Sequence, residues 1–265
     1  MKVYVYSNCQ NVAFYMDVES TFKFVLDDFD ICEKSKFDYI LTQPTFYTKF
    51  TTMDILRKFD PQKVIIYANY YLESYYLPLT YVYFENKTLH QPLDYHFNEI
   101  IHGYQNKFTV DEIYDSILDF DVSDEMIQQI TENNVKHAFD NLIFFKNKCP
   151  NIVYNCDFLK QHYRTQLLGY SMNHPTLSYM LWLTNEIKQF MDFNIKNETI
   201  DMFKHVIIPI YPKIKKHFQF ENENEFVFSN KKFDLRGMIE YYLNEYEKLS
   251  SEERYVLMNY RPKNR

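Results

Sequence analysis

KVYVYSNCQ, residues 2–10, decides the fold of this chain. Residues 2–6 form a short run of β-branched and aromatic side chains, which favours a β-strand. Polar residues follow at once and predict a turn that carries Cys9 beyond the end of that strand. A thiol at a strand end can act as the nucleophile in acyl transfer when a base lies close to it. The stretch therefore predicts both the first strand of a sheet and a reactive group at its edge.

The residues that follow alternate between expected strands and helices. Strands are expected at 22–26, 37–42 and 63–67, and helices at 10–20 and 51–59. This alternation predicts an α/β fold whose small, mainly parallel sheet lies in the N-terminal half, in a layout similar to SGNH hydrolases. Ligands of such sheets lie beyond the carboxyl ends of the strands. Cys9, Gln43 and Asn69 fall at or just past those ends, so we expect them to line one site.

The C-terminal part of the sequence is largely helical. Thr109 and Glu112 have the spacing of a capping box. Expected elements are helices near 93–102, from Ser123 towards 139, and at 154–164, 175–192, 234–249 and 251–259, with a short strand at 166–170. We interpret residues 1–265 as a single domain with an α/β part of about 1–108 and a helical part of about 109–265.

A second group of polar residues, Asn173-His174-Pro175, precedes the strongest predicted helix. Asn173 is a favourable N-cap and Pro175 is favoured in a first helical turn. A histidine at such a position can serve as a general base. We therefore hypothesise that Cys9 and His174 share one pocket. The alternatives are that Cys9 is a small buried core residue and that His174 is an exposed histidine in a capping turn.

Charge and composition exclude several classes of protein. The net charge is −7, whereas proteins that bind nucleic acids usually carry a basic surplus. The N-terminus has no apolar run typical of a signal peptide, and no stretch reaches membrane-spanning length. Four cysteines in 265 residues are too few for a disulfide scaffold. These features predict a cytoplasmic protein with reduced thiols and no membrane anchor.

The chain has only three glycines, and they are far apart. A glycine-rich phosphate loop needs several glycines close together, so a nucleotide-like ligand must be held by side chains or helix N-termini. The candidates for phosphate contacts are Arg164, Lys213, Lys215 and Lys216. The alternatives are a solvated face for the lysines and a helix C-terminal charge for Arg164.

A metal site is not expected from the sequence. Cys149, Cys156 and His162 are the residues that come nearest to a ligand set. Their spacing fits no compact zinc pattern.

Several of these motifs, in this order, resemble the WcbI-like family of bacterial capsular-polysaccharide biosynthesis acetyltransferases, which bind coenzyme A. The resemblance is carried by residues 7–10, 38–44, Arg164 and 173–176, with further similarity at 207–209 and 241–246. The family usually has glycine where Ser7 stands. By position, the resemblance implies that Cys9, Gln10 and His174 are the active-site candidates, with Asn8, Gln43 and Asn173 lining the pocket. We take Cys9 and His174 as the catalytic pair, and Asn8, Gln10, Gln43, Asn69 and Asn173 as the oxyanion or substrate pocket.

The resemblance also implies a reaction. An acyl group, most simply acetyl, would pass from a coenzyme A thioester to a sugar hydroxyl of a glycan or sugar-nucleotide acceptor. Either Cys9 is acylated first, or His174 activates the hydroxyl for direct attack. The alternatives are an SGNH-like esterase or deacetylase that uses water as acceptor, and a non-catalytic binding protein of the polysaccharide machinery. The acyl chain, the acceptor sugar and the oligomeric state are left open.

Overall fold

The computed structural model describes residues 1–25, 36–48, 50–85, 87–220, 225–228 and 230–262. The chain divides into two compact units, each assembled from two segments. Unit 1 comprises Met1–Leu72 and Gln129–Lys204, and unit 2 comprises Glu73–Gln128 and His205–Arg265. Leu26, the last residue of the strand expected at 22–26, and Cys32, one of the four cysteines, lie outside the described residues.

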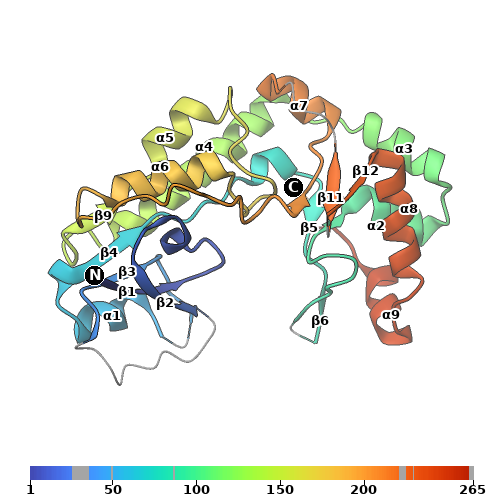
Figure 1. Cartoon of the computed structure of the whole chain (residues 1–265). Coiled ribbons are helices and arrows are strands. Elements are labelled where there is room, and N and C mark those ends of the chain that lie inside the picture. Colours follow the sequence, from blue (N-terminus) through green and yellow to red (C-terminus); the bar gives the residue numbers. More distant parts are fainter. Residues whose placement is uncertain (26–35, 49, 86, 221–224, 229, 263–265) are drawn as a thin grey trace. The chain divides into compact units, whose positions relative to one another are not determined.

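A five-stranded parallel sheet with the order β2-β1-β3-β4-β9 forms the centre of unit 1 (Figure 1). The strands are β1 (Lys2–Ser7), β2 (Glu19–Phe24), β3 (Tyr39–Thr42), β4 (Val64–Tyr67) and β9 (Asn151–Val153). Every neighbouring pair is parallel. The predicted α/β fold with a mainly parallel sheet is therefore confirmed.

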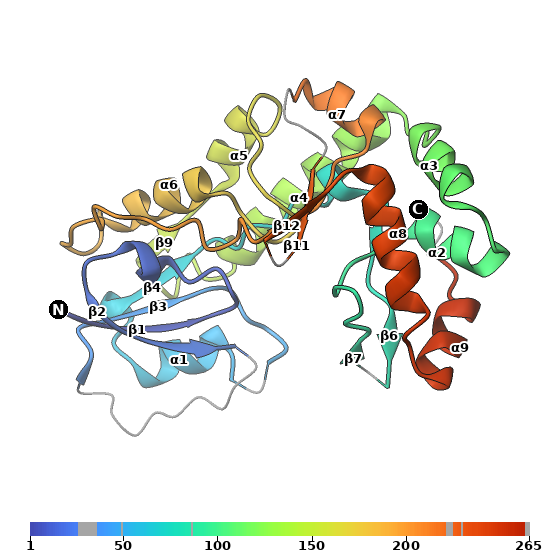
Figure 2. The ribbon, with the colours of Figure 1, turned by 45° about the vertical axis from the view of Figure 1, so that its right-hand side comes forward.

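Helices cover both faces of this sheet. One face buries Tyr4, Tyr6 and Ile66 against residues of α1 (Thr52–Lys58) and the end of α4 (Asp124–Ile143). On the opposite face α6 (Leu177–Ile187) packs on β4 and β9 (Figures 1 and 2). Because β4 is buried along its whole length, its sequence is a continuous apolar run rather than an alternating one.

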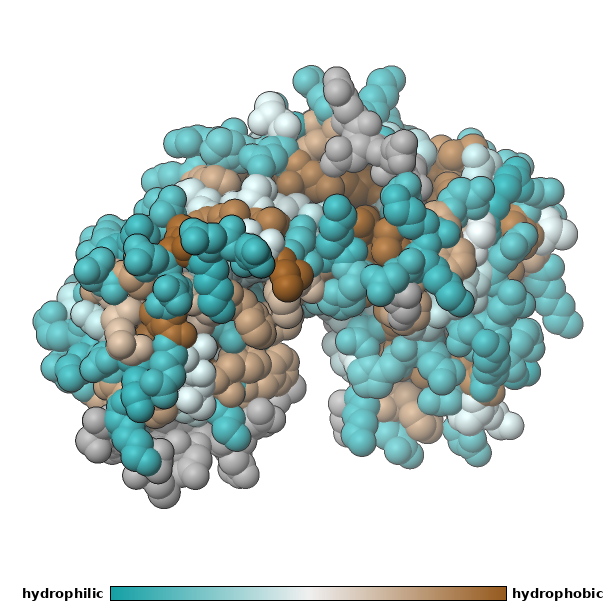
Figure 3. Space-filling view, in the orientation of Figure 1, coloured by the Kyte–Doolittle hydropathy of each residue, from teal (hydrophilic) through white to brown (hydrophobic). Residues whose placement is uncertain are grey.

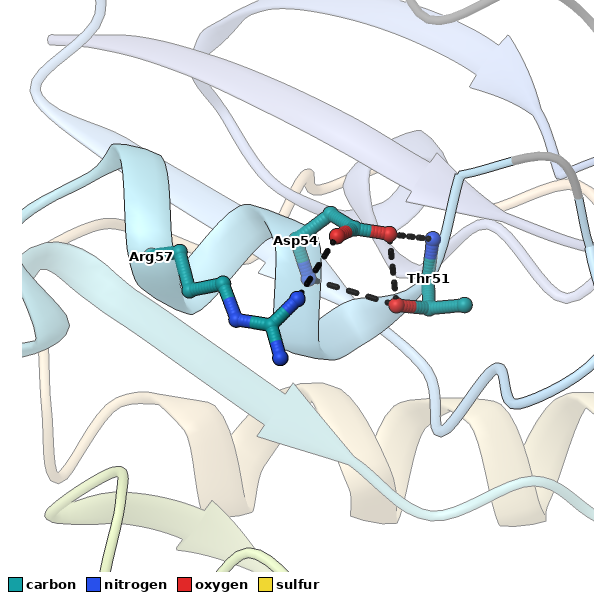
Figure 4. Close-up of polar contacts among 3 residues, drawn as sticks. All are labelled: Thr51, Asp54 and Arg57. Atoms are coloured by element: carbon teal, nitrogen blue, oxygen red, sulfur yellow. Dashed lines mark hydrogen bonds and ion pairs between the residues drawn. The ribbon is translucent and has the colours of Figure 1, made fainter.

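A capping box starts α1 (Figure 4). The Thr51 backbone N–H donates to the Asp54 carboxylate at 2.9 Å, and the Asp54 N–H donates to the Thr51 hydroxyl at 3.3 Å. Arg57 contacts the same carboxylate at 3.2 Å. Two N–H groups that a helix start leaves without intrahelical partners are thus satisfied, which agrees with the helix expected at 51–59.

Two expected elements of unit 1 are wrong. The helix expected at 10–20 is a single short 3-10 turn, η1 (Val12–Tyr15), because Met16 is already extended and pairs with Ile195. The strand expected at 166–170 is only an isolated bridge between Gly169 and Pro175. The apolar residues of this stretch form no β-ladder in the described part of the chain.

Two further elements differ from expectation at their ends or were missed. Helix α6 starts after Thr176 and not at His174. A residue before proline is pushed towards extended backbone, and Pro175 itself takes part in the bridge to Gly169. The edge strand β9 was missed, since three residues are too few to show a period of two. The remaining helix of unit 1, α5 (Cys156–His162), lies within the predicted range 154–164.

Unit 2 combines short strands with helices. Its strands are β5 (Leu79–Thr80), β6 (Tyr83–Phe84), β7 (Lys87–Thr88), β8 (His96–Phe97), β10 (Val206–Ile207), β11 (Phe226–Phe228) and β12 (Lys231–Phe233). Its helical elements are η4 (Glu73–Tyr76), α2 (Asn98–Asn106), α3 (Val110–Leu118), the start of α4, α7 (Pro212–Phe218), α8 (Leu235–Tyr246) and α9 (Ser251–Asn259). Strands β10, β11 and β12 form an antiparallel sheet.

Aromatic rings fill the interior of unit 2. The imidazole of His96 is stacked on the ring of Tyr246 and is fully buried. Its Nε2 lies 3.0 Å from the Leu89 carbonyl and its Nδ1 lies 3.0 Å from the Tyr246 hydroxyl. A carbonyl can only accept, so Nε2 carries a proton. Burial lowers the pKa of His96 and keeps the ring neutral near pH 7, so that Nδ1 accepts from the tyrosine.

Hydrophilic residues dominate the surface that each unit presents in Figure 3, with separate hydrophobic spots between them. Scattered apolar residues of this kind are normal on a folded protein. None of the helices in the described part of the chain is both long and apolar enough to cross a membrane.

Burial of His96 predicts a loss of stability in acid. Burial lowers the pKa of His96 from 6.5 to about 4. Since this folded-state pKa lies below the unfolded one, the stabilisation is complete above pH 6.5 and is lost as the pH falls towards 4. We expect the free energy of unfolding to fall by about 3 kcal/mol more across this window in the wild type than in His96→Gln.

The measurement is urea unfolding at a series of pH values, with the exposed His137→Gln as the control that is expected to keep the wild-type slope. An NMR titration that places the His96 midpoint near its ordinary value contradicts the interpretation.

Candidate active site at the carboxyl edge of the sheet

The side chain of Gln10 is the centre of this edge. It is fully buried, and its Nε2 donates to the carbonyls of Tyr70 at 2.9 Å and Asn173 at 2.8 Å. Its Oε1 accepts from the Tyr70 N–H at 2.8 Å and from Gln43 Nε2 at 3.3 Å. A carboxamide has two N–H donors and two acceptor sites, and all four are used. Gln10 therefore ties the turn after β1 to the segments that follow β3 and β4 and to the turn that contains Asn173.

The turn that carries Cys9 is held on both sides. Before Cys9, the Asn8 backbone N–H donates to Gln43 Oε1 at 3.1 Å, and Asn8 Nδ2 donates to Asn69 Oδ1 at 2.8 Å. After Cys9, the Gln10 N–H donates to Asn8 Oδ1 at 2.8 Å. Cys9 itself is half-buried. As predicted, it follows the end of β1 and lies at the carboxyl edge of the sheet.

The thiol of Cys9 is not activated by a helix. A helix was expected at 10–20, where its positive end would favour the thiolate, but the next element is the four-residue η1, which begins only at Val12. Burial raises the pKa of Cys9 above its ordinary value, and a backbone hydrogen bond opposes this only in part. The thiol is therefore protonated at neutral pH and needs a base to become a nucleophile.

His174 lies in a closed turn and not at a helix start. The Tyr170 N–H donates to the His174 carbonyl at 2.7 Å, and Gly169 pairs with Pro175 beside it. The predicted cap at Asn173 is wrong, because Thr176 is the N-cap of α6. The His174 ring is half-buried and stacks on Phe203, with ring centroids 5.1 Å apart and planes inclined by 23°.

The segment that carries Phe203 is anchored to the same turn. The Tyr170 hydroxyl donates to Asp201 Oδ2 at 2.5 Å, two residues before Phe203. The carboxylate, together with burial, also raises the pKa of Tyr15 to about 12, with burial the larger cause. The Tyr170–Asp201 bond thus links the segment that carries Phe203 to the turn that carries His174.

Five of the predicted site residues share one hydrogen-bond network within unit 1. These are Asn8, Gln10, Gln43, Asn69 and Asn173. The network brings the residue after Cys9 into contact with the residue before His174. It also distinguishes the buried amides from those that a ligand can reach, which the sequence could not do.

Gln10 and Gln43 are buried, and both amide N–H groups of Gln10 donate to protein carbonyls, so that neither is left for a ligand. Asn8 and Asn173 are half-buried, and Asn69 is exposed, so these amides have access to a ligand.

The predicted phosphate ligands lie in different units. Arg164 is an exposed residue of unit 1, and its Nε donates to the Tyr163 hydroxyl at 2.9 Å. Lys213, Lys215 and Lys216 belong to α7 of unit 2, where Lys213 pairs with Asp121 at 3.6 Å. Their role in binding a cofactor stays a prediction.

Within the residues that the structure describes, no group of histidine, cysteine and acidic side chains could hold a metal ion. Cys149 is buried, with its Sγ 3.2 Å from the Val64 carbonyl and 3.5 Å from the Asn151 carbonyl. The thiol is a part of the core beside β4 and β9.

Sequence reasoning missed Asn155, which is fully buried two residues beyond β9. Its Nδ2 donates to the Asn69 carbonyl at 3.2 Å and to the Tyr179 hydroxyl at 2.7 Å. The signal was the one that identified Asn69, a polar residue just past a short apolar run. It was overlooked because β9 itself was not predicted.

Comparison with known proteins supports the fold. No family model matches the chain. No curated protein sequence matches it significantly. A solved structure of WcbI matches with a TM-score of 0.73 and 16% identity, over 97% of this chain and 93% of that one. WcbI is described as a novel polysaccharide biosynthesis enzyme, in a native form without a disulfide bond between coenzyme A and one of its cysteines. At this level of identity the likeness shows a shared fold.

The saturated amide of Gln10 predicts a large loss of stability on truncation. In Gln10→Ala the N–H and carbonyl of Tyr70 and the carbonyl of Asn173 lose their partner while buried or half-buried. We expect the free energy of unfolding to fall by about 3 kcal/mol or more. Urea unfolding measures it, with Gln189→Ala as a matched control, since Gln189 is exposed and its side chain donates to the nearby Glu186 carbonyl. A loss as small as that of the control contradicts the assigned role.

Burial of Cys9 predicts slow alkylation near neutral pH. Because its pKa is raised above 9.0, the rate with iodoacetamide should still be rising at pH values where an ordinary thiol has reached its plateau. Peptide mapping by mass spectrometry follows Cys9 separately from the other cysteines, and the urea-unfolded chain supplies the ordinary profile. A midpoint below that of the unfolded chain would show an activated thiolate instead.

Proposed function

We propose that this protein transfers an acyl group from a coenzyme A thioester to a sugar hydroxyl in the biosynthesis of a bacterial surface polysaccharide. Cys9 and His174 carry the reaction, with Asn8 and Asn173 as amide donors. The proposal includes acetyl as the group transferred and a glycan or sugar nucleotide as the acceptor. A cytoplasmic location stays a prediction.

The observation that carries this proposal is the bond from Gln10 Nε2 to the Asn173 carbonyl at 2.8 Å. It joins the residue after the candidate nucleophile to the residue before the candidate base, across 163 positions of the sequence. Both turns are half-buried at the carboxyl edge of a parallel sheet, where ligands of such folds bind. The shared fold with WcbI, a polysaccharide biosynthesis enzyme described together with coenzyme A, supports the choice of donor.

The raised pKa of Cys9 shapes the covalent route. His174 takes the thiol proton as the Cys9 sulfur attacks the thioester carbonyl, and coenzyme A leaves as its thiol after receiving that proton. His174 then takes the proton of the sugar hydroxyl, whose oxygen attacks the acyl-cysteine and releases the Cys9 thiol. In the direct route His174 deprotonates the hydroxyl, which attacks the thioester, and coenzyme A leaves as its thiol with the proton that His174 took. Cys9 then contributes only to the shape of the pocket.

The tetrahedral oxyanion needs hydrogen-bond donors. The N–H groups of Gln10 and Asn11 already donate within the turn, to Asn8 Oδ1 and to the Cys9 carbonyl. Asn8 Nδ2 uses one of its two N–H groups on Asn69, so its second N–H and the amide of Asn173 are our candidates. One such donor contributes about 3 kcal/mol to transition-state stabilisation.

Coenzyme A brings several negative charges to a chain of net charge −7. Local cations must therefore hold its phosphates. Arg164, exposed in unit 1 and not part of the core, is our first candidate, and Lys213, Lys215 and Lys216 are the second.

The test combines mass and rate measurements. Incubation with acetyl-coenzyme A should add one acetyl group to the wild type by intact mass, and Cys9→Ala should remain unmodified. His174→Ala should lower turnover by about a hundredfold, the usual contribution of a general base. His137→Ala is the matched control, because His137 is exposed in α4 and lies outside the network.

Each other outcome has a defined meaning. Direct transfer predicts turnover without an acetylated intermediate and a Cys9→Ser variant that keeps much of its rate. Acetate release with no acceptor present favours a hydrolase. Calorimetry that detects no binding of coenzyme A or its thioesters at millimolar concentration contradicts the donor assignment.

A further inference from the structure

We propose that Asn155 is a positioning residue for the Cys9 turn, which it controls through Asn69 and Asn8. This inference deepens the assignment of the site and rests on the proposed function. Asn155 belongs to a row of residues with carboxamide side chains, each of which lies within two residues of the end of a parallel strand. The row comprises Asn8 after β1, Gln43 after β3, Asn69 after β4 and Asn155 after β9.

The contacts connect Asn155 to the Cys9 turn by way of Asn69 and Asn8. Asn155 Nδ2 donates to the backbone carbonyl of Asn69 at 3.2 Å. The side-chain oxygen of Asn69 accepts from Asn8 Nδ2 at 2.8 Å. Asn8 Oδ1 in turn accepts the N–H of Gln10, which fixes the peptide group between Cys9 and Gln10. A displacement of Asn69 is therefore transmitted to Cys9 through a single side-chain contact.

The amide of Asn155 is poorly explained by stability alone. The residue is fully buried, and its Oδ1 has no hydrogen-bond partner in the part of the chain that the structure describes. A buried acceptor without a partner costs free energy. Rotating the amide would not remove this cost, because it would set the side-chain oxygen against the Asn69 carbonyl. The amide does make two hydrogen bonds, one to the Asn69 carbonyl and one to the Tyr179 hydroxyl.

Helix capping does not account for Asn155 either. Asn155 precedes α5 and occupies its N-cap position, but its side chain makes no capping hydrogen bond. The Asn155 side chain does not cap its helix, and its own oxygen is unsatisfied within the described part of the chain. It does hold the backbone of Asn69 beside the site, and we therefore assign it a positioning role. Its amide donates to Asn69 and to Tyr179, and of these two residues Asn69 belongs to the candidate site.

Asn155→Asp separates positioning from packing because it preserves the shape of the side chain. An ionised carboxylate cannot donate to the Asn69 carbonyl, whereas a protonated carboxyl can. Burial raises the pKa of such a group, so the contact should return as the pH falls. We expect kcat to fall about tenfold near pH 8, with KM for acetyl-coenzyme A within about twofold, and to recover towards pH 5.5 relative to the wild type. Asn155→Leu should be slow at every pH, and the exposed Asn185→Asp should follow the wild-type profile.

The alkylation rate of Cys9 by iodoacetamide is the readout that does not depend on the proposed function. Asn155→Asp should change this rate at least about threefold at pH 8, even if the wild type shows no acyl transfer. Asn69→Ala, which removes the contact with Asn8 from an exposed residue, should change the rate in the same way. The double variant should be no further changed, since both substitutions break the same chain of contacts.

Three results overturn the proposal. They are a Cys9 alkylation rate unchanged in Asn69→Ala, additive effects in the double variant, and an Asn155→Asp variant whose loss of rate does not vary with pH. If Asn155→Asp does not fold, the Asn69→Ala result decides alone. If alkylation responds as expected but no acyl transfer is found, the positioning role stands and the proposed function fails.

Discussion

The side-chain amide of Gln10 is the interaction on which the candidate site depends. A fully buried carboxamide is costly unless all of its donors and acceptors are satisfied, and Gln10 satisfies all four with groups from three other segments. Any shift of one segment against another would break at least one of these bonds. The arrangement of the turns that carry Cys9 and His174 is therefore specified by a single side chain that does not itself face a ligand.

Neutral amides, and not charges, organise this edge of the sheet. Asn8, Gln10, Gln43, Asn69 and Asn155 bond to one another or to backbone groups. Such contacts carry no net charge, so they leave the pKa of the Cys9 thiol to be set mainly by burial, which raises it. Such an arrangement keeps the Cys9 thiol protonated unless a base takes its proton, which is the role that the proposed covalent route gives to His174.

Close approach of backbone and ring explains one of the three glycines. A Cβ at Gly169 would collide with the ring and hydroxyl of Tyr70, whose backbone is bonded to Gln10. Gly169 also pairs with Pro175 beside His174. The absence of a side chain there lets the His174 turn lie directly on the segment that follows β4. The glycine that matters at this site therefore serves packing, since no glycine in the described chain needs a positive φ.

Local sequence determined the strands of the sheet and the positions of polar residues at their ends. Runs such as Val64–Tyr67 are apolar over a length typical of a buried strand, and a polar residue just beyond them falls at the edge where parallel strands end together. That rule alone identified Cys9, Gln43 and Asn69 as neighbours. It would have identified Asn155 too, had the three-residue strand before it been long enough to show a pattern.

Only the tertiary structure decided which groups these residues contact. The hydrogen bonds of Gln10 and Gln43, the closed turn around His174 and the stacking of Phe203 all depend on contacts between distant segments. The Gln10 to Asn173 bond spans 163 positions, and no local period records such a pairing. A short-range pattern reports which way a side chain faces along its own element, whereas a long-range hydrogen bond depends on how the elements pack.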